Sequence, residues 1–134
     1  MVKALDPGEL TDILNGDAET LFYRFERICG LLACIREQYD NTSAPGKAPT
    51  DPDVAALEDE YDALFDEILD RIGNKNKKDF EDYAIYQEGW DRHMARVAGA
   101  FGMSEPATGI DWVVWKADLQ TKTDGMLTLL GVAV

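Results

Sequence analysis

The chain has 134 residues and carries 26 aspartates and glutamates against 13 lysines and arginines, a formal net charge of -13. This balance argues against direct binding to DNA, RNA or anionic lipid, because each of those ligands needs a basic patch that displaces counterions. The length predicts one acidic helical domain over residues 1–134, large enough to bury a core without a metal or a disulfide. No apolar run approaches the roughly 20 residues of a membrane span, and the first ten residues lack the apolar segment of a signal peptide, so we expect a cytoplasmic protein.

Two helix starts are predicted in the first twenty residues. Asp6 as N-cap, Pro7 at the first helical position and Glu9 reaching back form a capping box, and Gly16 ends a short helix. Asp17 opens a long helix whose apolar residues recur at intervals of four and three. These apolar residues are Leu21, Phe25, Ile28, Leu32, Ile35 and Tyr39.

The opposite face of this long helix also carries small or apolar side chains. A helix that is apolar on several sides is usually buried, so we predict a central position in the fold; the alternative is a second contact face, such as a self-association surface. The face comprises Tyr23, Gly30, Leu31 and Cys34. Cys29 and Cys34 point about 140° apart on one helix, so we expect reduced thiols rather than a disulfide between them.

Residues 40–50 are turn formers without apolar periodicity, which predicts a mobile loop rather than a domain boundary. Asp51 then caps a second long helix, which begins at Pro52 and ends at Gly73. Its apolar residues fall within an arc of about 100° and form its core side. They are Val54, Leu57, Tyr61, Leu64, Phe65, Ile68 and Ile72.

A third long helix is predicted from Asp79, with Asp82 three residues later, to Gly102. Its apolar side is again marked by intervals of three and four. The residues on that side are Phe80, Tyr83, Gln87, Trp90, Met94, Val97 and Phe101.

The C-terminal thirty residues leave two alternatives open. Thr108 with Asp111 resembles a capping box and predicts a fourth helix, whereas Asp124-Gly125 between apolar stretches is a strong hairpin signal. We therefore predict a mainly α fold: an antiparallel bundle of three long helices plus a short N-terminal helix, with a C-terminal helix or β-hairpin.

The second long helix carries the most unusual feature of the chain, because residues 51–70 hold nine carboxylates and no basic residue. Glu58, Asp62, Asp66 and Asp70 follow at intervals of four, which predicts a single row with a pitch of roughly 6 Å, and Asp59, Glu60 and Glu67 widen this row into a belt. Like charges at this spacing destabilise a helix by roughly 0.2–0.5 kcal/mol per pair, which suggests that a partner uses them. The alternative is a solvated face of an acidic protein. The candidate partner-binding residues are Glu58, Asp59, Asp62, Asp66, Glu67 and Asp70.

Few residues are available for catalysis. His93 is the sole histidine and has no carboxylate three or four residues away, so we interpret it as structural. Ser43 and Ser104 are the only serines, which gives a serine triad little to build on. A single histidine also excludes a ferritin-like di-iron site. We therefore expect no catalytic residue, no metal site and no cofactor.

One enzymatic alternative stays open. Asp59 with Asp62, and Glu67 with Asp70, resemble the paired carboxylates of all-α nucleotide pyrophosphohydrolases, in which Mg²⁺ bridges the protein to substrate phosphates. The resemblance implies a Mg²⁺-dependent hydrolase. However, both pairs fall on the flank of one helix, whereas carboxylates of such a site converge in a cleft between helices.

The favoured prediction is a non-enzymatic acidic protein that blocks a basic, nucleic-acid-binding site on a partner protein. Carboxylates on a rigid helix present to lysine and arginine the field that nucleic acid presents, and they steer the encounter. In size, charge and helicity the chain is similar to phage-encoded inhibitors of restriction or CRISPR effectors, and also to acidic immunity proteins that neutralise nuclease toxins. The expected partner is a basic effector or nuclease, with no direct nucleic-acid or membrane ligand.

Overall fold

The computed structural model describes residues 4–40, 52–97 and 109–134, and these residues are mainly α-helical. The helices are α1 (Pro7–Leu14), α2 (Ala18–Asp40), α3 (Pro52–Ile72), the short 3-10 helix η2 (Asn74–Asn76), α4 (Lys77–Val97) and α5 (Trp112–Leu129). Within these ranges no helix is both long and apolar enough to cross a membrane. Several predictions fall outside the described part: the loop at 41–50, the cap Asp51, the side chain of Tyr39, Phe101, the helix end Gly102, and Thr108.

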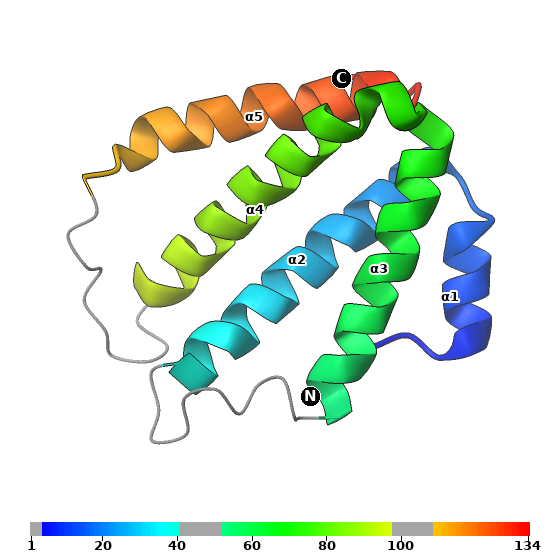
Figure 1. Ribbon diagram of the computed structural model, residues 1–134, viewed down its shortest axis with the longest axis horizontal. Coiled ribbons are helices and arrows are strands. Elements are labelled where there is room, and N and C mark those ends of the chain that lie inside the picture. Colours follow the sequence, from blue (N-terminus) through cyan, green and yellow to red (C-terminus); the bar gives the residue numbers. More distant parts are fainter. Residues whose placement is uncertain (1–3, 41–51, 98–108) are drawn as a thin grey trace.

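The long helices spread like a fan around α2. In Figure 1, α3 and α4 lie on either side of α2 and diverge from the turn that joins them. The short α1 lies beside α3, and α5 packs along α4 and runs in the opposite direction. The sequence predicted three long helices and left the C-terminal segment undecided, whereas the described residues form four long helices.

The first two helix starts are confirmed. Asp6 Oδ1 accepts a hydrogen bond from the Glu9 backbone N–H at 2.8 Å, and Glu9 Oε1 accepts from the Asp6 N–H at 3.3 Å, which completes the capping box of α1. At the start of α2, Asp17 Oδ1 accepts from the Thr20 N–H at 2.9 Å. These short acidic side chains satisfy N–H groups that a helix N-terminus leaves without partners.

The turn between α3 and α4 lies at the point from which the two helices diverge. As predicted, α3 ends at Gly73, whose φ of +90° lies in the region that favours glycine. The predicted start of the next helix at Asp79 is wrong: α4 begins at Lys77, because η2 runs directly into it. Beside this turn the rings of Phe65 on α3 and Phe80 on α4 stack, with their centroids 4.3 Å apart. The two helices are therefore in contact here and separate farther from the turn.

The C-terminal segment is a helix, so the hairpin alternative is wrong. Asp111 is the N-cap of α5, and its Oδ1 accepts from two backbone N–H groups of the first turn at 3.0 and 3.2 Å. Asp124-Gly125 lies inside this helix, followed by the buried Met126 and Leu127. Burial of these apolar side chains against the domain outweighs the local turn preference of the Asp-Gly pair.

The core is rich in aromatic rings where α2, α3 and α4 meet. Phe25 lies at its centre, with ring centroids of Tyr61, Phe65, Phe80 and Tyr83 between 5.0 and 6.3 Å away. The predicted apolar sides of α2 and α3 are buried over most of their length, whereas the predicted side of α4 is buried only near its start. The buried members are Leu21, Phe25, Ile28, Leu32, Val54, Leu57, Leu64, Ile68, Ile72, Phe80 and Tyr83.

The second face of α2 is less buried than predicted. Tyr23 is 47% exposed and Cys34 is also exposed, while Gly30 and Leu31 are half-buried. The helix is central, but α5 packs mainly on α4 and leaves this side of α2 open. Both cysteines are free thiols, as expected, with Cys29 buried.

A glycine in α4 sets how closely α5 approaches. A Cβ at Gly89 would lie 2.5 Å from Cζ2 of Trp115, whose Nε1 donates to the Tyr86 carbonyl at 3.0 Å. We expect Gly89→Ala to displace this ring and to destabilise the domain by about 1–3 kcal/mol despite the better helix propensity of alanine. Thermal unfolding measures the change. Gly125→Ala is the control, because nothing lies within 4 Å of a Cβ added there, and its stability should hold or rise. Equal melting temperatures of the two variants would contradict the steric argument.

Candidate acidic interaction surface

The arginine nearest the start of α2 is used inside the fold. Arg24 Nε lies 2.6 Å from Glu60 Oε2 and its Nη2 lies 3.1 Å from Glu60 Oε1, while the Leu5 N–H donates to the same carboxylate at 2.7 Å. Glu60 is only 2% exposed, so its inclusion in the acidic belt is wrong. This carboxylate faces α2 and the N-terminal segment, where it holds three elements together.

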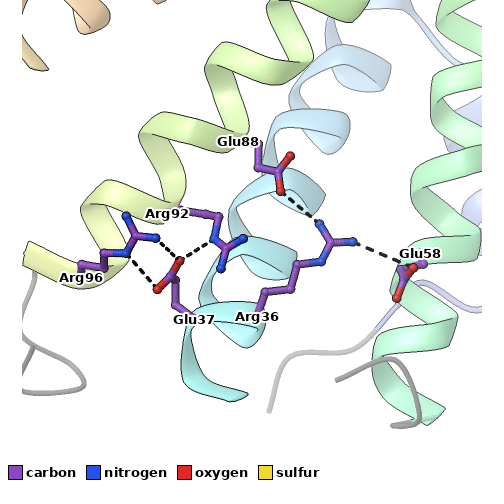
Figure 2. A network of polar contacts seen from close by, with 6 residues as sticks. All are labelled: Arg36, Glu37, Glu58, Glu88, Arg92 and Arg96. Atoms are coloured by element: carbon purple, nitrogen blue, oxygen red, sulfur yellow. Dashed lines mark hydrogen bonds and ion pairs between the residues drawn. The ribbon is translucent and has the colours of Figure 1, made fainter. Parts of the chain in front are cut away.

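A second buried carboxylate ties α2 to α4. Glu37 is 1% exposed and accepts hydrogen bonds from Arg92 Nε and, at 2.9 and 3.0 Å, from Arg96 (Figure 2). Burial on its own would raise the pKa of Glu37, but hydrogen bonds from Arg96 and Arg92 outweigh burial and hold that pKa below its usual value. The two arginines are therefore committed to an internal network.

Arg36 reaches from α2 toward both neighbouring helices. Its Nη2 lies 3.9 Å from Oε2 of Glu58 on α3, and its Nη1 lies 3.6 Å from Oε1 of Glu88 on α4 (Figure 2). Both distances exceed a hydrogen bond, and all three side chains are between one-third and one-half exposed. Such pairs contribute little to stability.

The six predicted partner-binding residues differ in their surroundings. Glu58 faces Arg36, and Glu67 forms an ion pair with Arg71 on its own helix at 2.9 Å. The remaining four are exposed, and none makes a hydrogen bond or an ion pair with any part of the chain that the structure describes. These four are Asp59, Asp62, Asp66 and Asp70.

The row on α3 winds around the helix rather than following one line. Each step of four residues turns by about 40°, because a helix has about 3.6 residues per turn. Glu58 and Asp62 line a cleft over α2, whereas Asp66 and Asp70 line a shallow depression beside Gly73 at the far end of α3. The predicted single surface is thus divided into two parts.

The cleft has a volume of about 260 Å³ and lies between the diverging α3 and α4, with α2 as its floor. Burial raises the pKa of Tyr61 to about 12, and the negative charge of nearby Glu88 adds to this effect. Burial likewise raises the pKa of the Cys29 thiol well above its usual value, so this thiol is neutral and a poor nucleophile. The lining residues are Cys29, Leu32, Arg36, Glu58, Tyr61, Asp62, Ala84 and Glu88.

Sequence reasoning missed a third carboxylate with limited access to water. Asp91 Oδ1 accepts from Gln87 Nε2 at 3.0 Å, but its buried Oδ2 has no hydrogen-bond partner in the described structure. Burial raises the pKa of Asp91 to about 6; the hydrogen bond from Gln87 opposes this shift and the negative charge of Glu26 reinforces it. No spacing in the sequence distinguishes Asp91 from the exposed carboxylates of α4, Glu81 and Glu88.

The described residues contain no group of three or more histidine, cysteine, aspartate or glutamate side chains placed to hold a metal ion. His93 stacks on Trp112 with ring centroids 3.9 Å apart, which gives it a packing contact. The chain matches no protein-family model, no curated protein and no solved structure.

Proposed function

We propose that the protein is a non-enzymatic acidic interaction protein that occupies a basic, nucleic-acid-binding site on a partner protein. The observation that carries this proposal is the separation of charge. Arg24, Arg92 and Arg96 are bound to buried carboxylates, while four aspartates of α3 stay exposed and without partners among the described residues. A surface that served only solubility would gain from interspersed lysine or arginine, and residues 52–70 of α3 contain neither.

The proposed mechanism is electrostatic. The carboxylates stand on a long helix that is anchored to the core along its apolar side, so their positions are fixed before binding. Their field speeds the encounter with a basic partner, and they take the place of phosphates at its lysine and arginine side chains. The partner is then a defence nuclease, blocked by an anti-CRISPR-like phage inhibitor, or alternatively a nuclease toxin, neutralised by its immunity protein.

The test removes charge from α3 without touching the core or the cleft. Asp59→Asn, Asp66→Asn and Asp70→Asn are combined in one variant, and binding is measured against a partner captured from lysate at low salt and then purified. We expect the affinity to fall about tenfold or more, mainly through slower association, and thermal stability to hold or rise slightly. The wild-type protein should compete with the partner's nucleic acid and should bind more weakly above about 0.1 M salt.

A matched control changes the net charge equally at other exposed positions. Glu19→Gln, Glu81→Gln and Asp118→Asn alter α2, α4 and α5 and leave the acidic face of α3 intact. Their combination should leave the affinity almost unchanged. Equal losses in both variants would show that net charge alone drives binding, and full affinity in the α3 variant would refute the proposal.

A further inference from the structure

The cleft between α3 and α4 carries an excess of negative charge. Its lining holds the carboxylates of Glu58, Asp62 and Glu88 around one guanidinium, that of Arg36. The 3.9 and 3.6 Å separations of Arg36 from Glu58 and Glu88 contrast with the 2.6 Å contact in the buried Arg24 pair. Within the described structure Glu58 and Glu88 accept no hydrogen bond, so their oxygens are available to a further donor.

The size and the walls of the cleft restrict what can enter. A volume of about 260 Å³ lies below the roughly 300–1,000 Å³ of pockets that hold drug-sized ligands, so it suits one side chain rather than a nucleotide. Leu32 and Ala84 supply apolar contacts, and half-buried Tyr61 supplies an aromatic ring. The best occupant is therefore small and positively charged, with several hydrogen-bond donors and a face that tolerates apolar surroundings.

A guanidinium group meets these conditions better than an ammonium group. It is planar, carries five donors in a fork that matches carboxylates, and stacks on aromatic rings. An ammonium group is more strongly hydrated and would lose more on entering a partly apolar cleft. The chemistry of the cleft thus distinguishes arginine from lysine.

We propose that the cleft receives one arginine side chain of the basic partner, hydrogen-bonded to Glu58 and Glu88 and packed against Tyr61. This inference rests on the proposed function, for which it names the anchoring contact. Arg36 competes for the same carboxylates. Because Arg36 is one-third exposed and makes no hydrogen bond with the described residues, its side chain can adopt another rotamer at a small cost in free energy.

The first experiment uses N-ethylguanidinium as a probe of the arginine head group. Backbone amide shifts of Leu32, Tyr61 and Ala84 are followed by NMR during titration at low salt, with ethylammonium and spermidine as comparison cations. We expect saturable shifts with millimolar affinity for ethylguanidinium and weaker effects of the other two cations. Non-saturating shifts, or equal effects of all three cations, would overturn the proposal.

Four variants sharpen this test. Glu88→Gln removes a carboxylate and Ala84→Leu fills the cleft, so each should raise the dissociation constant for ethylguanidinium about tenfold. Arg36→Gln should lower it severalfold, because the competing cation is gone. Ala56→Leu, at an exposed position of α3, should have no effect. If Ala84→Leu does not fold, as checked by its melting curve, Glu88→Gln decides, and wild-type affinity in the deciding variant overturns the proposal.

Affinity measurements with the purified partner distinguish failure of this inference from failure of the proposed function. Ala84→Leu should weaken binding of the partner as it weakens binding of ethylguanidinium. If Ala84→Leu keeps full affinity while the combined Asp59, Asp66 and Asp70 variant loses it, the inference fails and the proposed function stands. If the combined variant keeps full affinity although ethylguanidinium occupies the cleft, the proposed function fails instead.

Discussion

Replacing Glu37 with glutamine is expected to destabilise the domain by about 3 kcal/mol, because the change breaks a buried ion pair by removing one partner. The carboxylate is 1% exposed and accepts from both Arg92 and Arg96, whereas the two arginine side chains are 27% and 22% exposed. Glutamine keeps the shape and one acceptor oxygen but leaves both guanidinium groups facing a neutral amide. Their partial contact with water places the expected cost at the lower end of the usual range for such pairs.

Urea denaturation near pH 7 measures this loss. Glu67→Gln is the matched control, since its pair with Arg71 lies at the surface on one helix and should be worth less than about 1 kcal/mol. The pKa of Glu37 is lower in the folded state than its usual value of 4.5, so its stabilisation is present above that value and is lost as the pH falls through the folded pKa. The difference between wild type and Glu37→Gln should therefore shrink in acid. A difference that stays constant into acid would show that shape, not charge, is responsible.

Helix boundaries were predictable where neighbouring residues decide them. The capping box of Asp6 with Glu9, the cap at Asp17 and the glycine end at Gly73 each depend on side chains within a few positions, and all three are present. The Asp124-Gly125 pair carries an equally local turn signal, but the apolar residues after it are buried and the segment stays helical. Local rules fail where distant contacts contribute more free energy.

The candidate site was only partly predictable for the same reason. Spacing on one helix correctly marked Asp59, Asp62, Asp66 and Asp70 as exposed. It could not separate Glu60 from them, because the burial of Glu60 depends on contacts with α2 and the N-terminal segment. The cleft needed side chains from three helices at once, and no interval in the sequence relates them.

Asp91 has the opposite relation between charge and stability from Glu37. Its Oδ2 is buried without a hydrogen-bond partner in the described structure, and its pKa is raised by burial from 3.8 to about 6. The groups around it are Gln87 and Glu88 on α4, Glu26 on α2 and Lys116 on α5. Among these groups, Lys116 alone carries a charge that favours the ionised form. Because this pKa is higher in the folded state than in the unfolded chain, protonation of Asp91 stabilises the fold. The contribution is fully present when the pH is below the unfolded pKa of 3.8, and it is lost as the pH rises through about 6.

Asp91→Asn is therefore expected to stabilise the domain at about pH 8, by roughly 1–2 kcal/mol, because a neutral amide replaces a carboxylate that is ionised and poorly solvated there. Near pH 4 the two proteins should be almost equally stable, since wild-type Asp91 is then mostly protonated. Unfolding by urea across this interval measures the difference. Asp118→Asn on the exposed side of α5 removes the same charge and should give no such pH-dependent gain. A loss of stability at pH 8, or an equal difference at both pH values, would mean that the ionised carboxylate is well accommodated in the fold.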